Sequence, residues 1–319
     1  MAVYTQVSAE RIAELLSRYD VGTLVSAKGI AEGVENSNYV LETDRSRFIL
    51  TLYEKRVDAD DLPFFLKLLD HLAARGQPVP PAIADKAGRQ IQSVNGKPAC
   101  LIVFLPGLSP GEPNVAQSRS AGAALGKLHQ SLIDFADLRP NTLSLPGWHE
   151  LARRCGDALE EIAPDLGKIV AEELAFLDAN WPSELPRSAI HADLFPDNVL
   201  MLDDKVTGII DFYFACTDIR AYDLAVTHAA WCFDDEGRSF DAERSAALIA
   251  GYAEQLPLSD DEREALPILA RGASLRFLLT RAWDWLNTPD DALVTRKDPA
   301  AFLRRLEFYR AAGSELFAR

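Results

Sequence analysis

The chain has 319 residues, of which 48% are apolar, and it carries a net charge of -15. This size allows a large buried core and predicts two domains or lobes, while the acidic balance argues against a nucleic-acid surface, which needs clustered Lys and Arg. The four cysteines are scattered without a C-x-x-C pair and imply neither a zinc site nor a disulfide framework. Because we find no signal-like N-terminus and no apolar run of roughly 20 residues, we expect a cytoplasmic protein without a membrane partner.

The first hundred residues alternate between helix and strand patterns. Apolar residues at helical spacing predict helices over 8–19 and 61–75. Five short apolar runs predict strands, over 24–28, 39–43, 48–54, 90–94 and 99–105. Since a Pro-Gly break follows residue 105, we expect residues 1–105 to form a small antiparallel-sheet lobe.

The turn expected between the first two strands is rich in glycine and small polar residues. Glycine permits unusual dihedrals and close approach, so such a turn can offer backbone N–H groups to phosphate oxygens. The residues concerned are Gly29, Gly33, Asn36, Ser37 and Asn38. The turn matches neither G-x-G-x-x-G nor G-x-x-x-x-G-K-[ST], so taken alone this signal is weak, and an ordinary hairpin turn is the alternative.

The pattern becomes mainly helical after residue 115. Helices are predicted over 115–131, 148–157, 171–180, 223–232, 242–254, 260–287 and 300–312. We therefore expect residues 106–319 to form a larger helical lobe, which gives an α+β protein of two lobes. A cleft for a nucleotide would be expected between a sheet lobe and a helical lobe.

One loop of the helical lobe carries His191, Asp193 and Asn198 at the spacing H-x-D-x-x-x-x-N, which is typical of catalytic loops in phosphoryl transfer. In such a loop the Asp193 carboxylate can hydrogen-bond a substrate hydroxyl and act as its base. The alternative is that the loop holds turn-forming residues around Pro196, and that His191 is a satisfied core histidine.

A β-hairpin is expected directly after this loop, because two apolar runs flank residues 203–205. If its turn is centred between residues 204 and 205, Asn198 lies opposite Asp211. An amide oxygen and a carboxylate suit Mg²⁺, which takes one or two protein ligands and completes its shell with water and phosphates. Asn198 and Asp211 are therefore the predicted metal ligands.

Four motifs resemble the aminoglycoside-phosphotransferase and choline-kinase family, which has a bilobal protein-kinase-like fold. They are the segments 104–107, 124–129, 191–198 and 209–212. Within this family the chain is most similar to the bacterial members that phosphorylate homoserine. The stretches that carry this closer similarity are 28–38, 48–56, 61–65, 191–198, 210–218 and 275–281. The resemblance spans almost the whole chain.

The resemblance implies an ATP-dependent and Mg²⁺-dependent kinase that converts L-homoserine to O-phospho-L-homoserine, on the way to threonine. It assigns the base role to Asp193 and the binding of Mg²⁺ to Asn198 and Asp211. It also implies that the glycine-bearing turn covers the phosphates. The backbone that would meet the adenine belongs to Val103, Phe104 and Leu105.

One position departs from the family pattern. The third strand usually carries a lysine that pairs with the α- and β-phosphates, whereas here the position is held by Thr51. Either Lys28 or Lys55 takes over this role, or Mg²⁺ and backbone N–H groups suffice. Two alternatives stay open: a kinase of the same fold for choline, ethanolamine, an aminoglycoside or a sugar-like alcohol, and a nucleotide-binding regulatory protein without turnover.

The residues that select the acceptor are less defined. A choline site would need an aromatic cage, for which tryptophans and tyrosines such as Trp231, Trp283 and Tyr222 are available. An amino-acid site would need an arginine for the carboxylate, and Arg276 and Arg281 lie on neighbouring faces of one predicted helix. Core packing and surface ion pairs are the ordinary roles of these residues. Two further acids, Asp218 and Asp223, would either line the cleft or cap the helix near residue 223.

Overall fold

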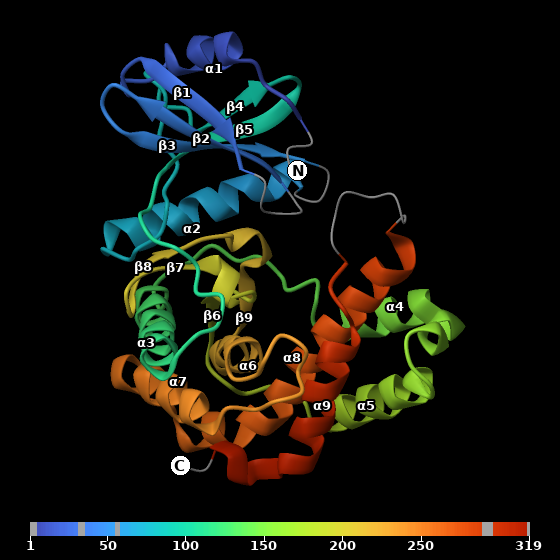
Figure 1. Ribbon diagram of the computed structural model, residues 1–319. Helices are drawn as coiled ribbons and strands as arrows, with labels where there is room; N and C mark the ends of the chain where they lie inside the picture. The colour runs from blue at the N-terminus through green and yellow to red at the C-terminus, as the bar shows by residue number, and fades with distance from the viewer. Residues whose placement is uncertain (1–4, 31–35, 55–57, 289–295, 318–319) are drawn as a thin grey trace. The chain divides into compact units, whose positions relative to one another are not determined.

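The structure is a computed structural model that describes residues 5–30, 36–54, 58–288 and 296–317. The chain divides into two compact units (Figure 1). The first unit comprises residues 1–106 and 208–213, and the second comprises 107–207 and 214–319. A sheet organises the first unit, whereas helices make up most of the second.

The first unit contains a five-stranded antiparallel sheet in the order β1-β2-β3-β5-β4. Its strands are β1 Leu24–Gly29, β2 Asn36–Thr43, β3 Arg47–Tyr53, β4 Ile91–Val94 and β5 Lys97–Val103. Side chains alternate between the two faces of each strand. Leu41, Leu50 and Leu101 therefore share one face, where all three are fully buried.

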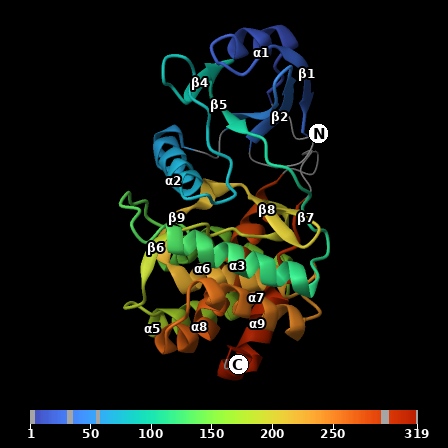
Figure 2. The same ribbon diagram turned by 90° about the vertical axis from the view of Figure 1, so that its left-hand side faces the viewer.

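Two helices flank this sheet. Helix α1, Ala9–Leu16, begins after Ser8, whose hydroxyl accepts the N–H of Arg11 at 3.3 Å. It buries its apolar stripe in the same core as the sheet residues above. Helix α2, Leu62–Ala74, follows the short 3-10 turn η1, Ala59–Asp61, and lies on the other side of the sheet from α1 (Figures 1 and 2).

The second unit is built mainly from helices. They are α3 Val115–Ser131, α4 Leu145–Cys155, α5 Leu166–Asn180, α6 Arg220–Trp231, α7 Ala242–Gln255, α8 Asp260–Asn287 and α9 Ala300–Ala312, with 3-10 turns at η2 Gly156–Glu161 and η5 Gly313–Phe317. Almost every residue of α6 is buried, so this helix is the centre of the unit. Within the described part of the chain, no helix is long and apolar enough to cross a membrane.

Helices α3 and α7 pack closely because small residues face one another at their crossing. A Cβ on Gly122 would lie 2.0 Å from the carbonyl oxygen of Leu248, and a Cβ on Gly251 would lie 2.1 Å from the carbonyl oxygen of Arg119. Any larger residue at either position would push the backbones apart. This contact fixes α3, whose last turn carries His129.

Two pairs of strands frame the predicted catalytic loop. Strand β6, Arg187–Ile190, pairs antiparallel with β9, Cys216–Ile219, and leads into the loop. The loop continues through the 3-10 turn η3, Pro196–Asn198, into β7, Val199–Leu202, which pairs with β8, Lys205–Ile209.

The predicted hairpin is present, but its turn lies one residue earlier than expected. Asp203 and Asp204 form the turn, and Lys205 is already the first residue of β8. Asp203 adopts a φ of 54°, the left-handed conformation that two-residue hairpin turns use at their first central position. The predicted pairing of Asn198 with Asp211 was therefore derived from a turn centre one residue too late in the chain.

Candidate active site

The expected catalytic residues Asp193 and Asn198 lie together in the loop after β6. The amide nitrogen of Asn198 donates to the main-chain carbonyl of Asp193 at 2.8 Å and to its carboxylate Oδ2 at 3.2 Å. Within the same loop, the N–H of Asp193 donates to Nδ1 of buried His191 at 3.2 Å. The side chain of Asp193 is only half-buried. These bonds hold a reachable carboxylate in a defined orientation.

The backbone between His191 and Asp193 is held in an unfavourable conformation. Ala192 has a φ of 64°, which non-glycine residues rarely adopt and which persists only when surrounding contacts enforce it. Here the N–H of Ala192 donates to Asp223 Oδ1 at 2.7 Å, and the N–H of His191 donates to Asp223 Oδ2 at 2.8 Å. On the other side, buried Arg276 donates through Nη1 to the carbonyl of Ala192. The peptide is thus clamped from both sides.

Asp223 is itself supported by a buried chain of polar groups. His129 bonds Asp223 through Nε2 and Tyr252 through Nδ1, both at 2.9 Å. Burial alone would raise the pKa of Asp223, but the hydrogen bond from His129 and the charges of His129 and His191 outweigh it and lower the pKa. The carboxylate therefore stays ionised and can bind both N–H groups strongly.

The expectations for Asp223 and Asp218 were wrong. Helix α6 begins at Arg220, so Asp223 does not cap it, and the fully buried side chain lines no cleft. Asp218 is buried too, where it accepts the amide N–H of Asn141 at 2.7 Å and pairs with Arg187 at 2.9 Å. The role of Asp223 has no local signal, because the loop residues that it binds precede it by about thirty residues and His129 precedes it by 94.

The aromatic residues considered for a choline cage serve as packing groups. Trp231 is fully buried and donates through Nε1 to the carbonyl of Leu194 at 2.9 Å. Tyr222 is fully buried as well, beside Trp181, with ring centroids 5.6 Å apart. The Trp283 ring is covered by the guanidinium of Arg154 at 3.6 Å. Trp231 and Tyr222 therefore present no open aromatic face for a quaternary ammonium, and one face of Trp283 is occupied by Arg154.

In the first unit, Asn36, Ser37 and Asn38 lie in strand β2 and not in the turn, contrary to expectation. Their backbones pair with β3, opposite Tyr53, Leu52 and Thr51 respectively. Gly29 is the last residue of β1. The other predicted phosphate contact, Gly33, lies outside the described residues.

The side chains of these three residues bind neighbouring strands and segments. Asn38 Oδ1 accepts the hydroxyl of buried Thr51 at 2.8 Å, and Asn36 Oδ1 accepts the N–H of Glu54 at 3.3 Å. Ser37 donates its hydroxyl to Glu54 Oε1 at 2.7 Å and accepts the N–H of Thr5 at 3.0 Å. They hold the sheet together, which explains why polar residues with low strand propensity occur within β2.

Thr51 sits where the family usually has a lysine, and the exposed cation Lys28 lies on the same face of the sheet. Lys28 pairs with Val40, two positions from Asn38, which itself faces Thr51 across the strands. Lys28 is exposed, and no ion pair is found for it within the described part of the chain. Lys55 lies outside the described residues.

Strand β5 ends at Val103, two residues earlier than predicted. Val103 donates its N–H to the carbonyl of Pro81 at 3.1 Å. Phe104 and Leu105 follow the strand as an irregular segment, and both are half-buried. Of the three residues expected near the adenine, Val103 therefore has its N–H already engaged.

The two predicted metal ligands belong to different units, Asn198 to the second and Asp211 to the first, so the metal pair stays a prediction. Asp211 adopts a φ of 65°, another left-handed non-glycine residue. Among the residues that the structure describes, no cluster of three or more His, Cys, Asp or Glu side chains could hold a metal by itself. A cation here would depend on few protein ligands, as Mg²⁺ does.

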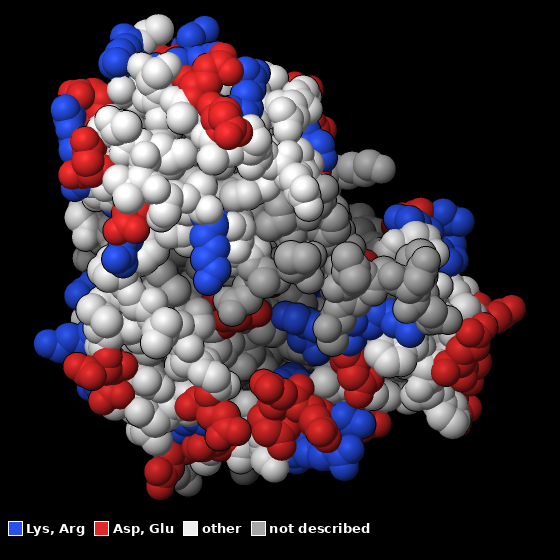
Figure 3. Space-filling view, turned by 45° about the horizontal axis from the view of Figure 1, so that its top comes forward, with Lys and Arg blue, Asp and Glu red and all other residues white. Residues whose placement is uncertain are grey.

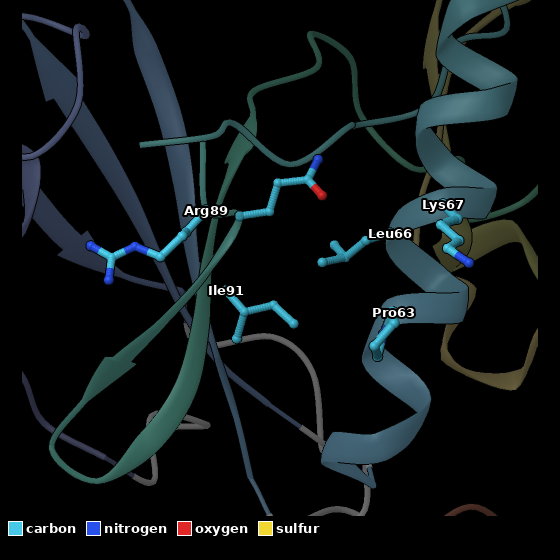
Figure 4. A pocket seen from close by; sticks show the side chains of 6 residues that line it. Pro63, Leu66, Lys67, Arg89 and Ile91 are labelled. Atoms are coloured by element: carbon cyan, nitrogen blue, oxygen red, sulfur yellow. The ribbon is translucent and has the colours of Figure 1, made fainter. Parts of the chain in front are cut away.

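A pocket in the first unit lies apart from the predicted residues. It is found between α2 and β4, where Leu66 and Ile91 face it from opposite sides (Figure 4). None of the residues expected to contact nucleotide lines it.

On the face shown in Figure 3, acidic and basic side chains alternate in small groups. Neither feature identifies a ligand.

Comparison with known proteins gives a consistent result. Residues 26–258 match the model of the phosphotransferase enzyme family. Homoserine kinase from Zymomonas mobilis is 56% identical over 317 residues, which cover 99% of both chains. Homoserine kinase from Xanthobacter autotrophicus is 51% identical and covers 98% of both chains.

Two solved structures share the fold at low sequence identity. Spectinomycin phosphotransferase, in complex with ADP and spectinomycin, superposes with a TM-score of 0.74 at 14% identity and covers 98% of this chain and 100% of its own. Choline kinase from Cryptosporidium parvum gives a TM-score of 0.68 at 16% identity, covering 97% and 96%. The predicted α+β, protein-kinase-like fold is confirmed.

Proposed function

The chain belongs to the phosphotransferase enzyme family, and from that premise we propose that it transfers the γ-phosphoryl group of ATP to the hydroxyl of L-homoserine. The product is O-phospho-L-homoserine, an intermediate of threonine synthesis. Relatives named homoserine kinase cover 98–99% of the chain at 51–56% identity. The observation that carries the proposal is the clamped loop in which Asn198 orients the Asp193 carboxylate.

In the proposed reaction, Asp193 accepts a hydrogen bond from the homoserine hydroxyl and takes its proton as the oxygen attacks the γ-phosphorus. The bond between the γ-phosphorus and the β,γ-bridging oxygen breaks, and ADP leaves. Such catalysis depends on positioning, because the transition state needs little covalent help from the protein. The clamp on Ala192 supplies this positioning, since it fixes the backbone that carries Asp193.

Asn198 and Asp211 are the proposed ligands of Mg²⁺. The amide nitrogen of Asn198 is used by Asp193, so the amide oxygen is the atom that can turn to a cation. An amide oxygen with a carboxylate oxygen fits the hard-ligand preference of Mg²⁺. When bound, the ion would neutralise charge on the phosphates.

The nucleotide contacts are proposed from the first unit. Backbone groups of Phe104 and Leu105 would meet the adenine, because the N–H of Val103 is engaged by Pro81. Lys28 would supply the charge that Thr51 cannot, since both occupy one face of the sheet. Gly29 and Gly33 would let the turn between β1 and β2 approach the phosphates closely.

An ADP-release assay with a panel of acceptors tests the proposal. We expect Mg²⁺-dependent turnover with L-homoserine and much lower turnover with choline, ethanolamine, an aminoglycoside and simple sugar alcohols. Preferred turnover of another alcohol would move the assignment to a different kinase of this fold. Nucleotide binding without turnover of any acceptor would instead favour a regulatory protein, the reading to which Thr51 gives some support.

A further inference from the structure

Helix α8 of the second unit runs alongside the catalytic loop. Its Arg276 donates to the carbonyl of Ala192. The next residue, Phe277, packs edge-on against Phe195 of the loop, with ring centroids 4.8 Å apart. Residues four apart lie on the same face of a helix. The side of α8 that contacts the loop therefore continues from Phe277 to Arg281.

Arg281 is a half-buried cation held by neutral groups. Its guanidinium lies over the Phe302 ring, 4.5 Å from the centroid, and Nη1 donates to the main-chain carbonyl of Asp298 at 3.3 Å. No carboxylate lies within ion-pair distance of it in the described part of the chain. Asp193 and Asp197 are still close enough to act on its charge and to favour the protonated form.

The neighbouring cations are already committed. Arg305 is buried and donates to the carbonyls of Ala229, Ala301 and Asp234. Lys297 pairs with Asp197 at 3.4 Å. Arg276 is buried and bound to the loop backbone, as described above. Among the described residues, Arg281 is the member of this group that is partly exposed and has no carboxylate within ion-pair distance.

We propose that Arg281 binds the carboxylate of the acceptor and is the specificity-determining residue for an amino-acid substrate. This inference rests on the proposed function. The homoserine hydroxyl is separated from the carboxyl carbon by three carbons, so Asp193 would receive one end of the substrate and Arg281 the other. A planar guanidinium fork matches a carboxylate in shape and charge, and the Phe302 ring beneath it restricts its orientation.

The charge state of Arg281 is compatible with this role. Burial and the charge of Arg305 lower the pKa of Arg281 to about 10. The group therefore stays protonated at neutral pH. In a partly desolvated site its interaction with a substrate carboxylate is stronger than at an exposed surface, so its loss should have a large effect on acceptor selection.

The test compares L-homoserine with 3-aminopropan-1-ol, which has the hydroxyl and the amine but no carboxylate. Each is measured as a substrate or, where turnover is absent, as a competitive inhibitor. In Arg281→Gln, kcat/KM for homoserine should fall by roughly 30-fold or more, as expected when a hydrogen-bonded charge pair loses one partner. The constants for 3-aminopropan-1-ol should change by less than about threefold. Arg281→Lys, which keeps the charge but loses the fork, should be intermediate for homoserine.

Arg304→Gln is the matched control. Arg304 also lies near Asp298, 4.0 Å from its carboxylate, but it donates to the carbonyl of Glu236, and its loss should leave both acceptors unaffected. Equal losses for both acceptors in Arg281→Gln, or unchanged homoserine kinetics, would overturn the inference. Absence of homoserine turnover in the wild-type protein is a separate result, since it removes the proposed function itself.

Discussion

The catalytic loop of the second unit and the β1–β2 region of the first unit both contain polar residues that suggested function, yet these residues are used differently. In the loop, contacts from distant helices hold a strained backbone, with Ala192 at φ 64°, and leave the Asp193 carboxylate accessible. In β2, the Ser37 hydroxyl and the amide oxygens of Asn36 and Asn38 are engaged in hydrogen bonds within the unit.

The difference shows how a chemical group becomes available. A reactive side chain stays accessible when other residues hold the backbone in place, as Asp223 and Arg276 do through hydrogen bonds to the loop. Where the polar residues hold the sheet themselves, they are less free to bind a ligand. Phosphate contacts in the first unit should therefore come from backbone groups and from Lys28.

The largest effect is expected for Asp193→Asn. The substitution keeps the size of the side chain and its position beside Asn198, but removes the base. We expect kcat to fall by roughly 10²- to 10⁴-fold while the Kd for ATP changes little, measured by steady-state kinetics and calorimetry. Asp204→Asn, in the exposed hairpin turn, is the control and should behave as wild type. Near-normal kcat in Asp193→Asn would refute the assigned role.

Asp223→Asn tests whether the clamp matters for chemistry as well as for folding. An amide cannot accept both N–H groups and the His129 bond as an ionised carboxylate does, so the loop should shift and kcat should fall by up to about 10²-fold. Asp218→Asn is the matched control, because it removes another buried carboxylate of the same unit, paired with Arg187. Both variants should lower Tm. If both lowered kcat equally, Asp223 would be only a stability residue.

Much of the fold follows from local sequence patterns. Helices α3 and α8 were predicted with the ends that the structure shows, because each has sustained periodicity and a capping box, at Asn114 and Ser259. The start of β2 was missed because strand propensity disfavours asparagine, whereas contacts from Thr51 and Glu54 override that preference.

The candidate site divides in the same way. Asp193 and Asn198 are five residues apart, so the motif that names them also brings them together. Asp223 and Arg276 reach the loop from helices that follow it by about 30 and 80 residues, and only the tertiary fold shows that they converge on Ala192. No pattern of spacing within the sequence carries this information.

Lys28→Ala tests the other half of the comparison, the source of positive charge in the first unit. If Lys28 contacts the phosphates, KM for ATP should rise by roughly tenfold, since a hydrogen bond to a charged group contributes about 1.5–3 kcal/mol. The KM for homoserine should change little. Lys86→Ala is the control, because Lys86 donates to the carbonyl of Ser17 in the same unit. An unchanged KM for ATP would leave the phosphates to backbone groups and Mg²⁺.

The last effect concerns stability and not catalysis, and it comes from α6, the helix that carries Asp223. Its His228 is fully buried between Tyr309, bonded at Nδ1 at 2.6 Å, and Ser245, bonded at Nε2 at 2.8 Å. Burial lowers the pKa of His228 from 6.5 to about 3. Above pH 6.5 neither the folded nor the unfolded state protonates it, so it adds no pH dependence there.

Below pH 6.5 His228 becomes protonated in the unfolded chain, whereas in the folded protein it stays neutral until about pH 3. His228 should therefore lower the free energy of unfolding by at most about 1.4 kcal/mol per pH unit across this window. His228→Gln removes the titration, so urea unfolding between pH 6.5 and 4.5 should show a shallower loss of stability than in the wild type. Parallel curves would mean that His228 is protonated in the folded protein, which two hydrogen-bond partners without negative charge cannot favour.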